Sequence, residues 1–168
     1  MARPRLSIVV PCYNEEKNIP LIVERFQAVL KGAADAELIL VDNGSRDGTG
    51  EAIDREMARY ILPCARKVTV ETNIGYGFGI LSGLRAARGE VLAWTHADLQ
   101  TDPQDVLTAD ALYRAHAGPG RKVFVKGRRV NRRPPHPTVR PRCVPKVSNP
   151  ARLTPSVEPG RANPVRRI

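Results

Sequence analysis

Short apolar segments, each followed by a polar loop and then by a helical pattern, constrain this chain more than any other feature. Their length and β-branched content are typical of buried strands, and they span residues 6–10, 37–41, 67–71 and 90–94, with a fifth expected at 123–125. Apolar residues at helical spacing follow the first four segments. Strands alternating with helices predict an α/β fold, with a parallel sheet and helices on both faces.

Polar loops follow the first, second and fourth predicted strands. In parallel α/β sheets ligands bind beyond the carboxyl ends of the strands, so these loops are expected to share one rim. After the fourth strand, His96, Asp98, Gln100 and Asp102 stand at alternate positions. If the extended conformation continues past the strand, its period of two sends all four side chains to one side.

The loop after the fourth strand allows a metal site and a simpler alternative. Asp98 and Gln100 offer the oxygen atoms that Mg²⁺ and Mn²⁺ prefer, which suggests a diphosphate held through a divalent cation. Asp98, Thr101 and Asp102 could instead only cap the following helix, and taken alone this has equal weight. His96 suits Mn²⁺ better than Mg²⁺, and it could equally hydrogen-bond a ribose or a phosphate.

Two further loops contain groups suited to a nucleotide. Tyr13 offers a flat face and Glu15 an acceptor, while Asp42 and Asn43 could bind the edge of a base, although Asp-Asn-Gly-Ser is also an ordinary turn sequence. The glycines at 75–79 lack the spacing of a dinucleotide fingerprint, and they predict a flexible loop that lets the backbone approach a ligand.

The charge and the proline content divide the chain near residue 131. Residues 1–120 have 13 Lys and Arg against 16 Asp and Glu, whereas residues 121–168 have 14 against one, and nine of the 15 prolines lie between Pro134 and Pro164. The sequence predicts one domain at residues 1–131 and a disordered basic tail at 132–168. The tail is either an interaction segment or, as we favour, the product of a GC-rich gene translated out of frame.

The cysteines and the hydropathy pattern favour the cytoplasm. Cys12, Cys64 and Cys143 are odd in number and form no Cys-x-x-Cys pair, which is simplest in a reducing compartment. No apolar run approaches the ~18 residues of a spanning helix, and no secretory signal is recognisable. We expect a protein of the cytoplasm or of the inner face of the cell membrane, and the mildly acidic folded part argues against nucleic acid as a partner.

Taken together, these motifs resemble the family 2 glycosyltransferases, in particular the dolichol-phosphate mannosyltransferase group. The motifs lie in the family's order at residues 9–15, 41–49, 73–83 and 96–103, and the resemblance covers residues 6–129. It implies a Rossmann-like GT-A fold, a GDP- or UDP-sugar donor and inversion at the anomeric carbon. A polyprenol phosphate or a glycan would be the acceptor, Mg²⁺ or Mn²⁺ the cofactor, and the cell-envelope glycan the setting.

The resemblance also assigns roles to individual residues. The nucleotide site would be lined by Pro11, Tyr13, Glu15, Val41, Asp42, Asn43, His96 and Ala97. Asp98 would be the catalytic residue, the metal would be held by Asp98, Gln100 and His96, and Arg129 would contact phosphate. Asn43 stands where the family commonly has Asp, which leaves the choice of nucleotide open. His96 replaces the first Asp of the Asp-x-Asp pair, which predicts weaker metal binding or a preference for Mn²⁺.

Family members continue well past the point where this chain becomes rich in Arg and Pro. The part expected to be missing normally helps to build the acceptor site, and in some members it carries membrane-associated segments. A lipid phosphate acceptor needs no general base because it is already ionised, whereas for a sugar hydroxyl no convincing carboxylate base is found. We predict a truncated or frameshifted polyprenol-phosphate glycosyltransferase. The alternative is a non-catalytic nucleotide-binding or interaction module whose basic tail contacts anionic lipid or nucleic acid.

Overall fold

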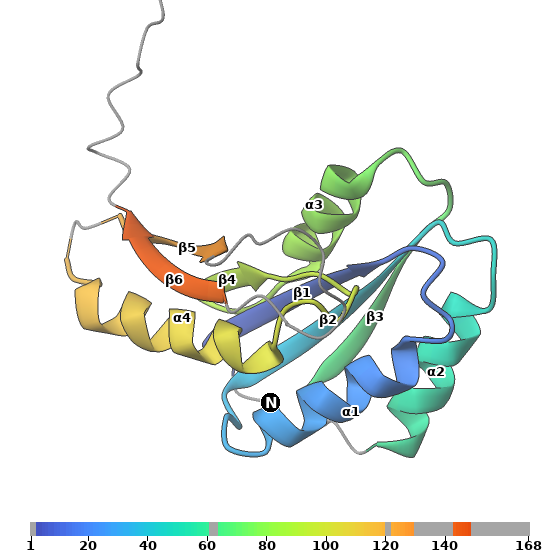
Figure 1. Cartoon of the computed structure of the whole chain (residues 1–168), viewed down its shortest axis with the longest axis horizontal. Helices are drawn as coiled ribbons and strands as arrows, with labels where there is room; N and C mark the ends of the chain where they lie inside the picture. The colour runs from blue at the N-terminus through green and yellow to red at the C-terminus, as the bar shows by residue number, and fades with distance from the viewer. Residues whose placement is uncertain (1–2, 61–63, 120–121, 130–142, 149–168) are drawn as a thin grey trace, which may run out of the picture.

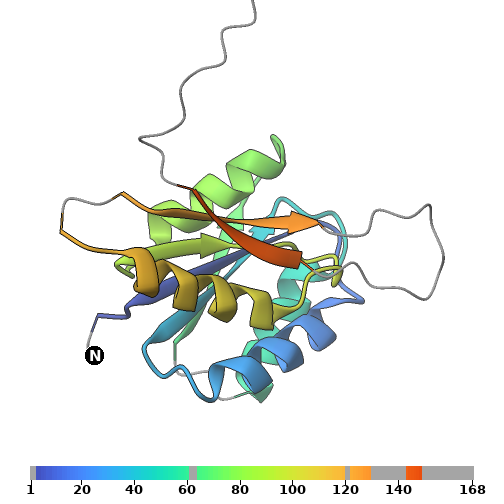
Figure 2. The same cartoon turned by 60° about the vertical axis from the view of Figure 1, so that its left-hand side comes forward.

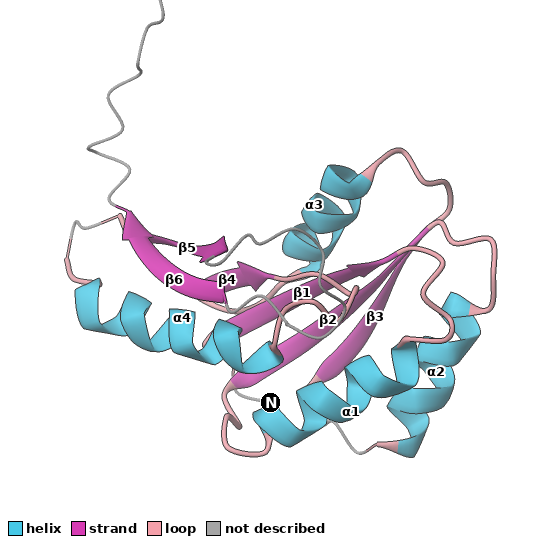
Figure 3. Ribbon diagram, in the orientation of Figure 1, coloured by secondary structure: helices cyan, strands magenta, loops and turns pink. Residues whose placement is uncertain are grey.

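The computed structural model describes residues 3–60, 64–119, 122–129 and 143–148 (Figures 1 and 3). Helices and strands alternate through the first four strands, as the sequence predicts. In chain order the elements are β1 (Leu6–Cys12), α1 (Ile19–Leu30), β2 (Ala36–Asn43), α2 (Thr49–Arg59), β3 (Ala65–Val70), α3 (Tyr76–Ala86), β4 (Val91–Trp94), α4 (Pro103–His116), β5 (Phe124–Arg129) and β6 (Cys143–Ser148).

The main sheet has the strand order β3-β2-β1-β4, and every pairing in it is parallel. The two faces of β1 pack against different helices because successive side chains alternate. Ile8 and Val10 belong to the core shared with α1, α2 and α4, whereas Val9 packs with Ile39 and Val41 on the face covered by α3. The predicted parallel sheet with helices on both faces is confirmed.

Helix α3 lies unusually close to the sheet at Gly83. A Cβ atom at Gly83 would lie 2.3 Å from Val9 Cγ1 and 2.8 Å from Val41 Cγ2, too close for any residue with a side chain unless the helix moves. This close packing fixes the start of α3, and with it Gly75 and Tyr76, at the carboxyl end of the sheet.

The buried carboxylate of Glu37 cross-links the strands near their amino ends. Glu37 accepts hydrogen bonds from Ser7 Oγ at 2.6 Å and from the Arg88 N–H at 2.7 Å, and Arg66 Nη2 lies 2.9 Å away. Burial alone would raise the pKa of Glu37, but these hydrogen bonds and the charge of Arg66 outweigh it and lower that pKa. The network ties β1, β2, β3 and the end of α3 together from inside.

Strands β5 and β6 form a separate antiparallel pair beside α4 (Figures 1 and 2). The strand expected at 123–125 is observed as β5 and extends to Arg129. The sequence predicted no regular structure after residue 131. The structure differs at Cys143–Ser148, which form strand β6. Pro145 pairs opposite Gly127 in a two-stranded sheet, where both strands are edges and the missing N–H of proline is tolerated. The domain boundary at residue 131 stays a prediction.

Strand β4 is the least protected strand of the main sheet. It pairs with β1 on one side, and within the described residues no strand pairs with its other side. Leu92 and Trp94 of this strand are 48% and 43% exposed. The sheet is therefore closed at its centre and open at β4.

Candidate functional site

The loops after β1 and β2 are cross-linked at the carboxyl end of the sheet. The Asn14 N–H donates to Ser45 Oγ at 3.2 Å, and the Arg46 N–H donates back to Asn14 Oδ1 at 2.9 Å. The Glu15 N–H also donates to Thr49 Oγ1 at 2.8 Å. Asn14 has a φ of 54°, a conformation that asparagine tolerates better than most residues. The first two predicted rim loops therefore form one rigid unit.

The loop after β2 also supports the loop after β3. Asn43 Nδ2 donates to the Gly75 carbonyl at 3.2 Å, and a Cβ atom at Gly44, whose φ is 70°, would lie 2.4 Å from the Asn73 nitrogen. Asn43 is only 2% exposed, and its Oδ1 is a buried acceptor without a partner in the described part of the chain. Its side chain thus lies under the loop, and contact with a base stays a prediction that requires this loop to move.

The loops after β3 and β4 meet through an aromatic pair. Tyr76 Oη lies 2.9 Å from His96 Nδ1, and the two rings are parallel within 2° with centroids 5.3 Å apart. Burial, and secondarily the charge of Asp98, raises the pKa of the Tyr76 hydroxyl, which keeps it protonated at neutral pH. The sequence reasoning missed Tyr76, although a tyrosine at a helix start between two glycines is a signal worth following. Hydrogen bonds now connect all four loops.

The loop after β4 contains one residue with a positive φ. Leu99 has a φ of 59° and packs against the core, so the backbone is not extended there. Asp98 Oδ1 accepts the Gln100 N–H at 3.0 Å within the turn, whereas Asp102 accepts the Gln104 N–H at 2.9 Å as the N-cap of α4. The condition of an extended loop is therefore not met at Leu99, although His96, Asp98, Gln100 and Asp102 are all exposed and the residues between them are more buried.

The remaining nucleotide-site candidates divide into buried and exposed residues. Pro11, Val41 and Ala97 are buried, and the Val41 side chain faces α3, so it has no access to the rim. Tyr13 is exposed, and the half-buried Glu15 accepts a hydrogen bond from Asn18 Nδ2 at 2.5 Å.

Two further predicted residues have different positions. Asp42 Oδ1 accepts the Ser45 N–H at 3.1 Å, which places its carboxylate within the turn of the second rim loop. Arg129 ends β5, and its side chain lies outside the described part of the structure.

The polar groups of the fourth loop suit a cation that arrives with a phosphate ligand. Within residues 3–60, 64–119, 122–129 and 143–148, no three His, Cys, Asp or Glu side chains converge into a complete metal site. Asp98, Gln100 and His96 are all exposed in one loop. Mg²⁺ commonly uses one or two protein carboxylates together with water and substrate phosphates, so a single Asp with an amide fits such an ion. Since Tyr76 occupies His96 Nδ1, only Nε2 of that ring is free to face a ligand.

Cys12 is a structural residue of β1. Burial, and then the charges of Glu15 and Asp42, raises the pKa of its thiol so far that the thiol stays protonated. It is fully buried in the core of the sheet, where it packs as a small apolar side chain.

Comparison with known proteins identifies the family. Residues 7–153 match the model of Glycosyl transferase family 2. The chain belongs to this family. A family 2 relative, the undecaprenyl-phosphate 4-deoxy-4-formamido-L-arabinose transferase of Pseudomonas fluorescens, is 35% identical over 109 residues, which are 63% of this chain and 32% of the relative. The dodecaprenyl-phosphate galacturonate synthase of Rhizobium johnstonii is 38% identical over 102 residues, which are 60% of this chain and 30% of the relative.

Solved structures support the GT-A fold of this family 2 chain. A mannosyltransferase from Pyrobaculum calidifontis in complex with GDP-Man and Mn²⁺ superposes with a TM-score of 0.61 at 27% identity, over 73% of this chain and 35% of that one. Staphylococcus aureus TarS 1–349 in complex with UDP gives a TM-score of 0.56 at 26% identity, over 77% and 37%. The chain thus spans about a third of the length of these relatives. Among the described residues no helix has the length and apolar character needed to cross a bilayer.

Proposed function

We propose that this chain is the donor-binding part of a transferase that moves a sugar from a GDP- or UDP-sugar to a polyprenol phosphate with inversion. The observation that carries the proposal is the continuous set of hydrogen bonds that joins the four loops at the carboxyl end of the parallel sheet. Ligands bind at this end in such sheets, and the loops contain an exposed tyrosine, a carboxylate and a short oxygen-rich turn.

The nucleotide would bind over the loops after β1 and β2. Tyr13 is exposed next to the rigid loop pair and offers a face on which a base can stack. Glu15 has one carboxylate oxygen bonded to Asn18, and its other oxygen is left to accept a hydroxyl of the ribose. Asn43 replaces a carboxylate by an amide in the same region, and its buried Oδ1 would gain a partner if a donor group of the base displaced the loop above it.

The diphosphate would lie over the loop after β4, with a divalent cation held by Asp98, Gln100 and His96. When bound, this cation neutralises charge on the diphosphate leaving group. Because His96 substitutes a neutral ring for a carboxylate, we expect Mn²⁺ to be preferred over Mg²⁺. Asp98, as the only carboxylate of the three, would be the catalytic residue through this contact, and Arg129 would bind phosphate from the end of β5.

The transfer itself requires no general base if the acceptor is a lipid phosphate. An ionised phosphate oxygen attacks the anomeric carbon, the bond from that carbon to the diphosphate oxygen breaks, and the nucleoside diphosphate leaves with the electron pair. The relatives that are named as polyprenol-phosphate enzymes support this acceptor class. A site of action at the inner face of the cell membrane follows from such an acceptor.

Titration calorimetry tests the donor part of the proposal. The full chain is titrated with GDP-mannose and with UDP-glucose, each with Mn²⁺ and then with EDTA. Saturable binding of one nucleotide sugar that depends on Mn²⁺ is the expected result. Absence of binding to both donors in the presence of Mn²⁺ contradicts the proposal and favours a non-catalytic interaction module.

A further inference from the structure

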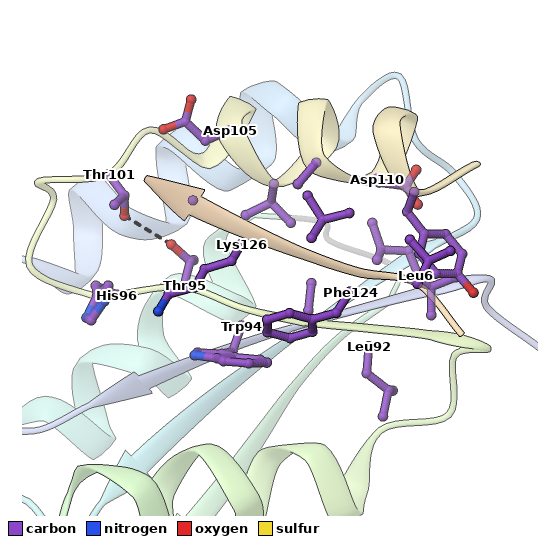
Figure 4. A pocket seen from close by; sticks show the side chains of 18 of the residues that line it. Leu6, Leu92, Trp94, Thr95, His96, Thr101, Asp105, Asp110, Phe124 and Lys126 are labelled. Atoms are coloured by element: carbon purple, nitrogen blue, oxygen red, sulfur yellow. Dashed lines mark hydrogen bonds between the residues drawn. The ribbon is translucent and has the colours of Figure 1, made fainter. Parts of the chain in front are cut away.

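A cavity of about 470 Å³ opens between β4, α4 and β5, on the unprotected side of the sheet (Figure 4). Its volume lies within the usual range for sites that bind small organic ligands. The walls are mostly apolar, and their main residues are Val91, Ala93, Val106, Ala109, Phe124 and Val125. No role at the nucleotide site has been assigned to these residues.

The two ends of the cavity differ in chemistry. Leu6 and Leu92 line one end, whereas Thr95, His96 and Thr101 line the other. At the polar end Thr95 Oγ1 lies 3.0 Å from Thr101 Oγ1.

One cation faces the polar end. Figure 4 shows Lys126 of β5 extending toward Thr95 and His96. Asp110 at the other end is paired with Arg5 at 2.7 and 2.9 Å, so its charge is balanced. Glu90 and Asp105 also line the cavity, and the Asp105 carboxylate points away from Lys126 in the same view. The cavity therefore combines a long apolar wall with a cationic, hydroxyl-bearing mouth.

We propose that this cavity binds the acceptor: the first isoprene units of a polyprenyl phosphate lie along the apolar wall, and the phosphate lies at Lys126 and Thr95. A polyprenyl phosphate has the same order of chemistry, a branched hydrocarbon that ends in a phosphate. This inference rests on the proposed function, and it adds the location of the acceptor.

The mouth of the cavity adjoins the loop proposed to hold the donor diphosphate. His96 lines the polar end of the cavity, Gln100 also lines the cavity, and both belong to that loop. A phosphate at Lys126 would thus approach the donor from the β4 side, while the nucleotide occupies the loops after β1 and β2. The hydrocarbon would cover Trp94 and Phe124, which are 43% and 42% exposed and 6.2 Å apart between ring centroids.

Trp94 provides a direct readout because it is the only tryptophan of the chain and lines the cavity. Its fluorescence is followed while the full 168-residue chain is titrated with geranyl phosphate, with inorganic phosphate and with geraniol. We expect a saturable change in emission with geranyl phosphate, a weaker one with geraniol, and none with inorganic phosphate. No change with geranyl phosphate, or an equal change with inorganic phosphate, overturns the proposal.

Matched variants locate the binding. Ala109→Phe fills the cavity from α4, whereas Ala111→Phe adds the same group on the exposed face of the same helix. We expect Ala109→Phe to abolish the response and Ala111→Phe to keep it, with thermal unfolding confirming that both fold. If Ala109→Phe does not fold, Lys126→Gln at the mouth replaces it, with an expected loss of affinity for geranyl phosphate of about tenfold. An unchanged affinity in the folded variant overturns the proposal.

Calorimetry with GDP and UDP in the presence of Mn²⁺ on the same samples separates this inference from the proposed function. Nucleotide binding without a Trp94 response contradicts the acceptor cavity and leaves the donor site standing. A Trp94 response that is lost in Ala109→Phe, without nucleotide binding, supports the cavity and contradicts the transferase.

Discussion

The centre of the sheet and its β4 flank are built from the same kind of residues but differ in how they are covered. All seven residues of β1 are buried, and β2 is buried at seven of its eight positions, because helices cover both faces. In β4 half-buried and exposed residues alternate, and Leu92 and Trp94 are nearly half exposed. The apolar side chains at the centre are covered by helices of the same chain, whereas those of β4 stay partly exposed to solvent.

The difference divides the proposed functions between two parts of the molecule. The loops after β1 and β2, which are proposed to bind the nucleotide, are joined by hydrogen bonds next to the closed centre, so these two loops have their shape before any ligand arrives. The proposed acceptor cavity lies on the open flank, where a ligand would remove apolar surface from water. We expect substitutions in the centre to change stability and substitutions on the flank to change binding.

The largest contrast is expected between two leucine truncations. Leu38→Ala removes a fully buried side chain of β2 and should lower the free energy of unfolding by about 3 kcal/mol. Leu92→Ala on β4 removes a side chain that is half exposed, and should cost less than about 1 kcal/mol. Urea denaturation of both variants measures the difference. Equal losses would mean that the flank is as closed as the centre.

Substitution of the buried Glu37 at the centre of the sheet should give the next largest loss in the free energy of unfolding. Glu37→Gln keeps the shape but leaves Arg66 without its charged partner, at an expected cost of about 2 kcal/mol to the free energy of unfolding. Glu24→Gln on the exposed face of α1 is the control, with little change.

The pKa of Glu37 also predicts how stability depends on pH. Because this pKa is lowered by folding, its contribution is fully present above the pKa of the unfolded chain and is lost as the pH falls through that of the folded state. The stability curve of Glu37→Gln should therefore be flatter in the acid range than that of the parent. Parallel curves below neutral pH would contradict this role.

A smaller effect is expected from restoring a carboxylate to the metal loop. His96→Asp adds a negative charge beside Asp98 and should raise the affinity for Mg²⁺, measured in the presence of GDP, on the order of tenfold. Stability should change little because His96 is exposed. Equal Mg²⁺ affinity before and after the substitution would exclude His96 from the metal ligands.

The smallest effect concerns the aromatic pair between the third and fourth loops. Tyr76→Phe keeps the stacking on His96 but removes the hydroxyl at Nδ1, so Mn²⁺ affinity in the presence of GDP should fall about threefold. Tyr60→Phe at the end of α2 is the matched control. ¹⁵N NMR of the imidazole should also show a changed tautomer population in Tyr76→Phe. An unchanged spectrum would mean that the hydroxyl does not orient the ring.

Periodicity predicted the sheet well because the first four strands owe their structure to local pattern. Residues 6–10 and 37–41 are mostly apolar runs, and the structure places them as the two buried strands of the centre, extended by only a few residues. The strand at Cys143–Ser148 was not expected, since six residues with a proline carry little periodic signal and their pairing with β5 is a tertiary contact.

The convergence of the polar loops was predicted correctly, and the geometry within them less well. The order of strands and loops placed the rim correctly, but no sequence pattern indicated that Leu99 would turn the fourth loop through a positive φ to bury its side chain. The contact of Tyr76 with His96 joins residues 20 apart through the packing of α3 on the sheet, which depends on Gly83. The cavity likewise has no local signal, because strands and a helix distant in sequence form it.

The most direct test of the donor site is an electron paramagnetic resonance titration of Mn²⁺ with GDP or UDP, comparing the parent chain with Asp98→Asn. Free Mn²⁺ gives a strong signal that decreases when the ion binds to the protein. We predict that the parent chain binds one Mn²⁺ per molecule only when a nucleoside diphosphate is present, and that Asp98→Asn loses this binding while unfolding at the same temperature. Equal Mn²⁺ binding by both chains would contradict the assignment of Asp98 and of the rim as the donor site.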